Sequence, residues 1–88
     1  MARFDMNMAE HAQISRGAAA EVLFELGLMY SLGREVEADP VEAHKWFNLA
    51  AIRGHEKARQ YRMEIAEELS ADELREALRR AREWMGLH

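Results

Sequence analysis

The 88-residue sequence contains no cysteine, one proline and few aromatic residues, which make up 8% of the chain. The lack of cysteine excludes disulfide bonds and thiolate metal sites, and it fits a reducing compartment, so we predict a cytoplasmic protein. Because aromatic residues are few, alanine and leucine supply much of the apolar fraction, and both favour helices. A chain of this length has room for one small domain.

The first thirty residues also lack a long apolar run. Charged residues at Asp5, Glu10, Arg16 and Glu21 interrupt them, whereas a signal peptide or a membrane span needs an uninterrupted apolar stretch. We therefore predict no insertion into a membrane.

Apolar residues between positions 18 and 32 recur at helical spacing, which predicts a helix over this range. Gly33 follows the last of them, as is typical of a glycine that ends a helix. Gly27 lies inside the helix, where it costs roughly 1 kcal/mol relative to alanine, so we expect another backbone to approach it closely. The residues of the predicted buried stripe are Val22, Leu26, Met29 and Tyr30.

The dipeptide Asp39-Pro40 marks the start of a second helix, because a side-chain cap is followed by proline at the first helical position. We predict this helix over residues 40–53, with Gly54 as its terminator. Val36, in the loop before it, is expected to fill the gap between the two helices. The apolar face of the second helix comprises Ala43, Trp46, Phe47, Ala50 and Ala51. Residues 18–54 thus form a helix-loop-helix hairpin.

Two more helices are predicted after the hairpin, one over residues 55–69 and one that begins after Ser70. Ser70 and Glu73 have the spacing of a capping box, in which each side chain satisfies the other residue's backbone N–H. The last helix carries an apolar stripe of Leu74, Ala77, Leu78, Ala81, Trp84 and Met85. Residues 55–88 are therefore expected to form a capping helix pair.

Residues 1–17 allow two interpretations. Asp5 could cap a short helix that ends at Gly17. Alternatively, this segment is an arm that lays Phe4 or Ile14 against the domain.

The order of residues in the hairpin resembles the Sel-one-like repeat, a relative of the tetratricopeptide repeat. The residues that carry the resemblance are Leu26, Gly27, Tyr30, Gly33, Val36, Asp39, Ala43, Trp46, Phe47, Ala50, Ala51, Gly54 and His55. The chain departs from the family pattern at Glu35, which replaces a second loop glycine, and at Arg62-Met63, which replaces a Leu-Gly pair. The helices after the hairpin are thus a cap more than a second repeat.

This resemblance implies an all-α fold, a short α/α hairpin solenoid of four to five helices in one domain. It implies an adaptor or scaffold for protein complexes, of a kind common in bacterial signalling, secretion or cell-envelope contexts. It brings no shared catalytic residues. It assigns Gly27 and Ala50 to helix contact, Tyr30 and Trp46 to hairpin packing, and Gly33 and Asp39 to the loop.

The titratable residues do not form a catalytic or metal-binding motif. None of His11, His44, His55 and His88 has a partner at the spacing of a zinc site, so we expect solvent-facing or capping histidines, no metal and no cofactor. No Ser-His-Asp, Cys-His or phosphate-cradling glycine arrangement is present, and we predict that the chain is not an enzyme.

Arginines are numerous in the two predicted helices after the hairpin, but glutamates are interleaved with them at spacings that pair charges on a solvated helix face. We therefore predict no nucleic-acid binding, and a nucleic-acid-associated regulator stays a remote alternative. The arginines are Arg59, Arg62, Arg75, Arg79, Arg80 and Arg82.

The hairpin has more apolar residues than fit on one buried stripe. The additional ones are the candidate partner-binding residues: Leu23, Phe24, Leu28, Leu32 and Ile52. Our leading hypothesis is an adaptor that binds a peptide or helix of another protein. The alternative is a structural homodimer with no separate ligand, whose interface is centred on Leu23, Phe24, Leu28 and the arm around Phe4 and Met8. A third arrangement, in which the arm folds over the first helix, gives a monomer.

Overall fold

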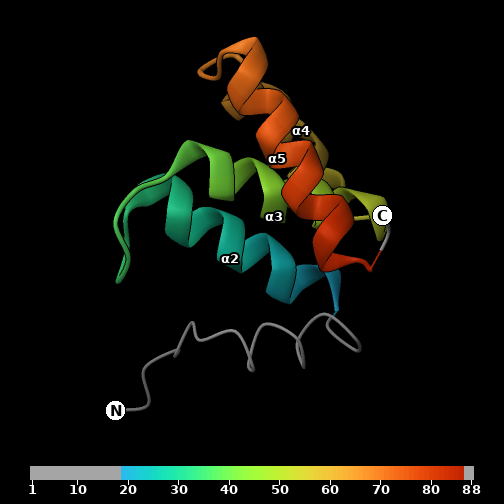
Figure 1. The fold of residues 1–88 in the computed structure, drawn as a ribbon. Coiled ribbons are helices and arrows are strands. Elements are labelled where there is room, and N and C mark those ends of the chain that lie inside the picture. Colours follow the sequence, from blue (N-terminus) through green and yellow to red (C-terminus); the bar gives the residue numbers. More distant parts are fainter. Residues whose placement is uncertain (1–18, 87–88) are drawn as a thin grey trace.

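The computed structural model describes residues 19–86 of the chain. Within this range it contains four helices and no strand (Figure 1): α2 (Ala20–Leu32), α3 (Pro40–Ile52), α4 (Glu56–Ala66) and α5 (Ala71–Trp84). The predicted all-α class is confirmed. The predictions for residues 1–17 lie outside the described residues.

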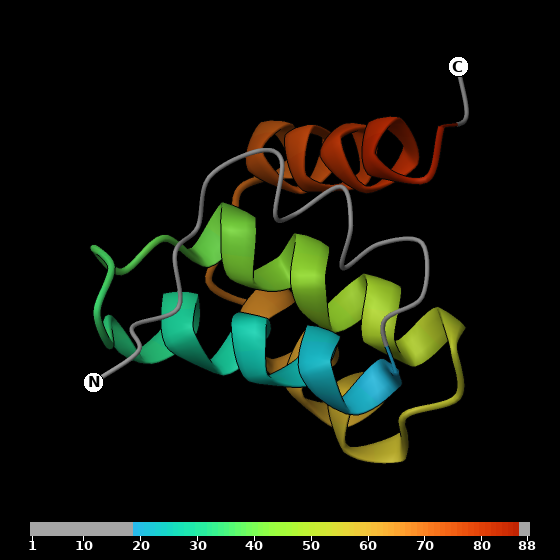
Figure 2. The same ribbon diagram turned by 90° about the horizontal axis from the view of Figure 1, so that it is seen from below.

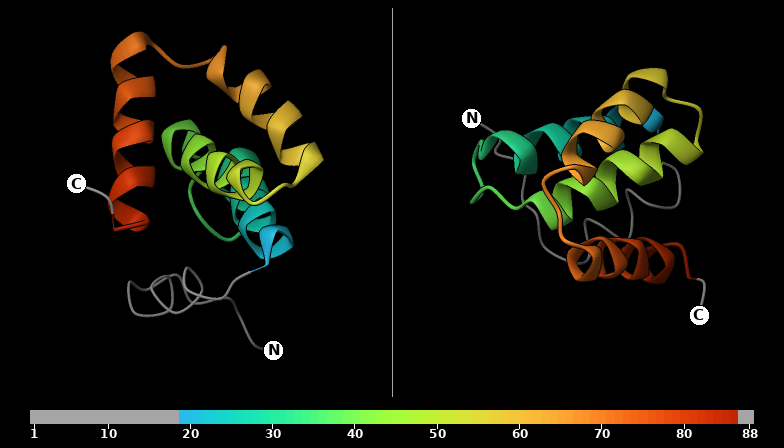
Figure 3. Two further views of the ribbon diagram at one scale, coloured as in Figure 1. Left: turned by 90° about the vertical axis from the view of Figure 1, so that its right-hand side faces the viewer. Right: turned by 90° about the horizontal axis from the view of Figure 1, so that it is seen from above.

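Helix α3 lies at the centre of the described fold. In Figure 2, α2 runs along one side of α3 and α5 runs along the other. Helices α4 and α5 diverge from their connecting loop and leave α3 between them (Figure 3). Three large side chains of α3, those of Trp46, Phe47 and Leu49, are fully buried. The core is therefore built around one helix that all the others contact.

The loop between α2 and α3 is closed by hydrogen bonds at both ends. Gly33 adopts the left-handed conformation (φ 72°) and ends α2, as predicted. The backbone N–H of Asp39 donates to the carbonyl of Tyr30 (2.9 Å). The Asp39 carboxylate accepts from the backbone N–H groups of Val41 (3.0 Å) and Glu42 (3.2 Å), and thereby caps α3 as predicted.

The buried face of α2 differs from the predicted stripe. Leu23 and Phe24 are buried in the core, whereas Val22 is 40% exposed. Leu26 is buried as predicted. The contact at Gly27 is with the ring of Phe47 on α3, where we expected a backbone. The face was misassigned because α2 is apolar nearly all round, so that spacing alone does not select one side.

His55 joins α4 to the hairpin. Its Nδ1 accepts a hydrogen bond from the backbone N–H of Ala58 (3.1 Å), so Nε2 carries the proton and donates to Glu21 Oε1 (2.9 Å). The imidazole ring also stacks on Phe24, with ring centroids 4.3 Å apart. The predicted capping histidine is confirmed, and α4 begins one residue after it, at Glu56.

Helix α5 packs on the side of α3 that lies opposite α2. Ser70 and Glu73 form the predicted capping box. Ala77 and Ala81 are buried, so that α5 approaches α3 closely. At the end of α5, the ring of Trp84 meets the ring of Trp46 edge-on, with centroids 5.0 Å apart.

Candidate interaction surfaces

The outer face of α2 carries an apolar hollow. The hollow has a volume of about 280 Å³ and is lined by Val22, Glu25, Leu26 and Met29. Leu32, three residues after Met29, extends the apolar stripe by one turn and is 63% exposed. We call Val22, Met29 and Leu32 the α2 face.

The five residues predicted to bind a partner do not form one surface. The assignment of Leu23 and Phe24 to an exposed interface is wrong, because the rings of Phe47, His55 and Tyr61 lie over Phe24 and both residues are buried. Leu28 is half-buried against the core.

Leu32 and Ile52 are both exposed, but they lie at opposite ends of the hairpin. Leu32 ends α2 and Ile52 ends α3, and the two helices run in opposite directions. Each helix has 13 residues, which at 1.5 Å per residue gives a length of about 20 Å. Leu32 is thus part of the α2 face and Ile52 is not.

Sequence analysis missed Val22 as a surface residue. The sequence contained a signal for the exposed side of α2. Glu21 and Glu25 are four residues apart, lie on the same side of the helix, and are both exposed. A pair of glutamates one turn apart indicates the solvated side of a helix. Val22 lies between them.

A second pocket is lined by residues of α3, α4 and α5. Its volume is about 260 Å³. We call it the α3–α4–α5 pocket, and its lining residues are His44, Asn48, Arg62, Met63, Ala66, Leu74 and Leu78.

His44 forms part of the floor of this pocket and is only 3% exposed. The expectation of a solvent-facing His44 is therefore wrong, because α4 and α5 cover the side of α3 on which it lies. Burial, and to a smaller extent the nearby Arg62 cation, lower the pKa of the His44 imidazole. Within residues 19–86, His44 Nδ1 is buried and has no hydrogen-bond partner.

Comparison with known proteins identifies the hairpin. The family model described as the Sel1 repeat matches residues 20–55. The hairpin is a Sel1 repeat. The resemblance inferred from the sequence is thus confirmed, and Sel1 repeats in general mediate protein–protein interaction without being enzymes themselves. No curated protein and no solved structure gives a significant match to the chain.

The Sel1 repeat is joined to α5 by an ion cluster. Lys45 on α3 is 7% exposed, and its Nζ lies 3.0 Å from Glu42 Oε1 and 4.1 Å from the centroid of the Trp46 ring. Arg80 on α5 donates to Glu42 Oε2 (2.8 Å). Burial lowers the pKa of Lys45, while Glu42 opposes that shift.

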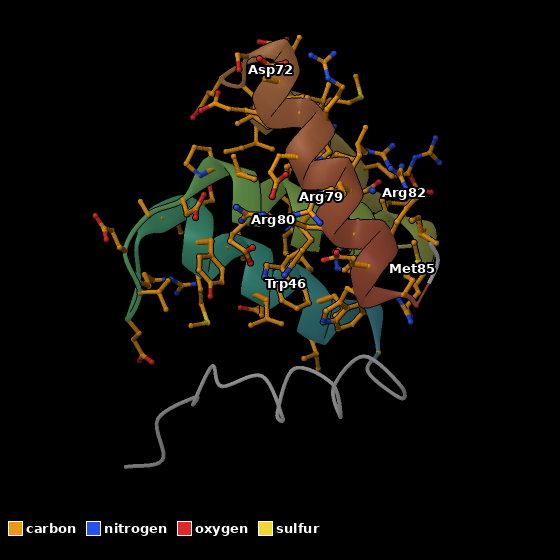
Figure 4. The ribbon with its side chains drawn as sticks, viewed as in Figure 1. Trp46, Asp72, Arg79, Arg80, Arg82 and Met85 are labelled. Carbon is orange, nitrogen blue, oxygen red and sulfur yellow. The ribbon has the colours of Figure 1, made fainter. Side chains whose placement is uncertain are left out.

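The solvent-exposed side of α5 also carries several ion pairs. Arg80 points toward α3 and Arg82 projects away from it (Figure 4). Arg79 bonds to Glu76 and Glu83. The hydrogen bonds from Arg79 and Arg80 lower the pKa of Glu76 to about 2. Arg79 and Arg80 therefore contribute little uncompensated positive charge.

The described residues contain no group of three or more histidine, aspartate or glutamate side chains that could hold a metal ion. His11 and His88 lie outside this range. None of the helices in residues 19–86 has both the length and the apolar character needed to cross a membrane.

Proposed function

We propose that this protein is a small adaptor that binds a peptide or helix of another protein through the α2 face of its Sel1 repeat. The observation that carries the proposal is the apolar hollow beside Val22 and Met29, whose lining also includes the core residue Leu26. The removal of apolar surface from water is the dominant favourable contribution to most protein–protein association. The cysteine-free composition supports a reducing, cytoplasmic setting.

A helical or extended segment suits this face better than a small ligand does. The hollow offers few polar groups to a ligand, because Glu25 is the one polar residue among those that line it. A small molecule needs several converging polar groups to fix its orientation, whereas a peptide gains specificity from successive side chains along a stripe. Leu32 provides the next contact along that stripe.

A second copy of the chain is the competing occupant of the α2 face. A twofold pair would bring the same face of each copy together. In that case the protein is a structural homodimer, and no separate partner is needed.

Affinity capture from a native lysate, combined with light scattering, tests the proposal. The bait is wild type, Val22→Glu or Gln60→Glu, since Gln60 is exposed on α4 and gives the same change in charge outside the α2 face. We expect a saturable heterologous partner that Val22→Glu loses and Gln60→Glu retains. Equal capture by both variants, or recovery of the chain alone with a dimer mass at all concentrations, would overturn the proposal.

A further inference from the structure

The α3–α4–α5 pocket has the size of one apolar side chain. A cavity of about 150 Å³ holds a benzene molecule, and pockets for drug-sized molecules begin at about 300 Å³. The volume here, about 260 Å³, lies between these limits. A leucine or phenylalanine side chain therefore fits.

The walls of the pocket are apolar and accessible. Met63 on α4 is 67% exposed, and Leu78 on α5 is also exposed. Ala66 and Leu74 complete the apolar lining. The predicted core stripe of α5 included Leu78, but this residue is 36% exposed. An apolar side chain that enters from outside would cover these residues.

Arg62 gives the pocket an uncompensated positive charge. Its Nη1 donates to Asn48 Oδ1 (2.8 Å), and no carboxylate within residues 19–86 forms an ion pair with it, whereas Arg59, Arg79 and Arg80 each have one. Arg62 is half-buried, so that a carboxylate placed beside it would be screened less than at an open surface. The adjoining His44, with an unpartnered Nδ1, adds no negative charge to balance it.

We propose that the α3–α4–α5 pocket binds an acidic, apolar segment of the partner protein, in which a leucine-sized side chain fills the pocket and a neighbouring carboxylate pairs with Arg62. The inference rests on the proposed function, because it names the chemistry of the partner. It places a second contact site on the far side of α3 from the α2 face. A partner that binds both sites would contact the protein on two sides of α3.

Two capped dipeptides serve as probes, acetyl-Asp-Leu-amide and its neutral counterpart acetyl-Asn-Leu-amide. Each is titrated into the full chain and followed by two-dimensional amide NMR. We expect saturable shifts at the pocket residues, and a dissociation constant about tenfold weaker for the neutral dipeptide, since a charge-assisted hydrogen bond is lost. Equal affinities, shifts confined to α2, or no shift would overturn the inference.

Substitutions locate the two halves of the site. Arg62→Gln should abolish the preference for the acidic dipeptide, whereas Arg82→Gln, which makes the same charge change on the outward side of α5, should retain it. Ala66→Phe should fill the pocket and remove binding of both dipeptides. Should this variant fail to fold, Leu78→Ser at the exposed wall replaces it and should weaken both dipeptides alike. A preference that survives Arg62→Gln would contradict the assigned role of Arg62.

The outcomes separate this inference from the proposed function. If the wild-type chain captures a partner that depends on Val22, but neither dipeptide binds, the adaptor function stands and the pocket assignment fails. If the dipeptides bind as expected and the capture yields only the chain itself, the adaptor proposal fails while the pocket retains its preference for an acidic, apolar ligand.

Discussion

The ring of Phe47 on α3 lies directly against Gly27 on α2. A Cβ atom at Gly27 would stand 2.4 Å from Phe47 Cδ1 and 2.5 Å from Cε1, well inside van der Waals contact. Phe47 is fully buried, so its ring has little room to turn aside. This contact sets the spacing of the hairpin.

Gly27→Ala should therefore destabilise the protein by about 1–3 kcal/mol through overpacking, although alanine is the better helix former. Urea denaturation measures the change. In a double-mutant cycle, Phe47→Leu should reduce the penalty of Gly27→Ala, because the two residues touch. A Gly27→Ala variant as stable as wild type would show that the ring can move.

Glu35 is held in a conformation that suits glycine. Its φ is 64°, and it is the one non-glycine residue of the described chain with a positive φ. A side chain in this region costs about 1–2 kcal/mol. Glycine would remove this strain, but its larger conformational entropy in the unfolded chain offsets part of the stabilisation. Glu35→Gly should thus raise the unfolding free energy by roughly 0.5 kcal/mol.

The matched variant for Glu35 is Gly33→Ala, since Gly33 has a φ of 72° in the same loop. It should lower the unfolding free energy by about 1 kcal/mol. Thermal and urea denaturation of both variants measures these changes in the unfolding free energy. A loss of stability in Glu35→Gly would mean that the glutamate side chain makes a contact worth more than the strain.

Glu42 and Lys45 should respond unequally to substitution. Glu42→Gln leaves the Lys45 cation nearly buried without its nearest carboxylate, and breaking such a pair from one side costs about 3 kcal/mol. Lys45→Met removes the buried cation while keeping its apolar stem, and should change the unfolding free energy by less than about 1 kcal/mol. Chemical denaturation of both variants at neutral pH tests this order, and the reverse order would contradict it.

His44 should make the fold sensitive to mild acid. Burial and Arg62 lower its pKa in the folded protein, while the unfolded chain keeps the ordinary value of 6.5. Below about pH 6.5 the unfolded state takes up a proton that the folded state does not. The unfolding free energy therefore falls as the pH falls, by at most about 1.4 kcal/mol per pH unit, until the pH reaches the folded pKa of His44.

The measurement compares His44→Gln with wild type between about pH 7.5 and 5.5, above the range in which most carboxylates titrate. The variant should lose less stability over this interval. The other histidines are common to both proteins, so the difference in slope belongs to His44. Parallel stability curves would show that His44 is protonated in the folded state as readily as in the unfolded chain.

Most ends of the helices could be predicted from the sequence because the signals that mark them are local. The end of α4 was predicted wrongly, since this helix ends at Ala66 and not at residue 69. The Asp39 carboxylate reaches backbone N–H groups only two and three residues away, and Ser70 and Glu73 form a closed pair across one turn. Gly33 needs only its own φ. The Sel1 repeat can also be recognised from the sequence, because its motif includes these capping residues and the small residues between the helices.

The surfaces could not be predicted in this way, because they depend on residues distant in the chain. Leu23, Phe24 and Val22 are neighbours of similar apolar character. The fold buries Leu23 and Phe24, the latter against the rings of Phe47, His55 and Tyr61, and leaves Val22 exposed. Likewise, His44 and Lys45 are buried because α4 and α5 return across α3. The sequence by itself determined those helix ends that carry a local cap, through contacts within one turn. Only the tertiary structure decided which side of each helix meets solvent, because burial is set by what the rest of the chain places against it.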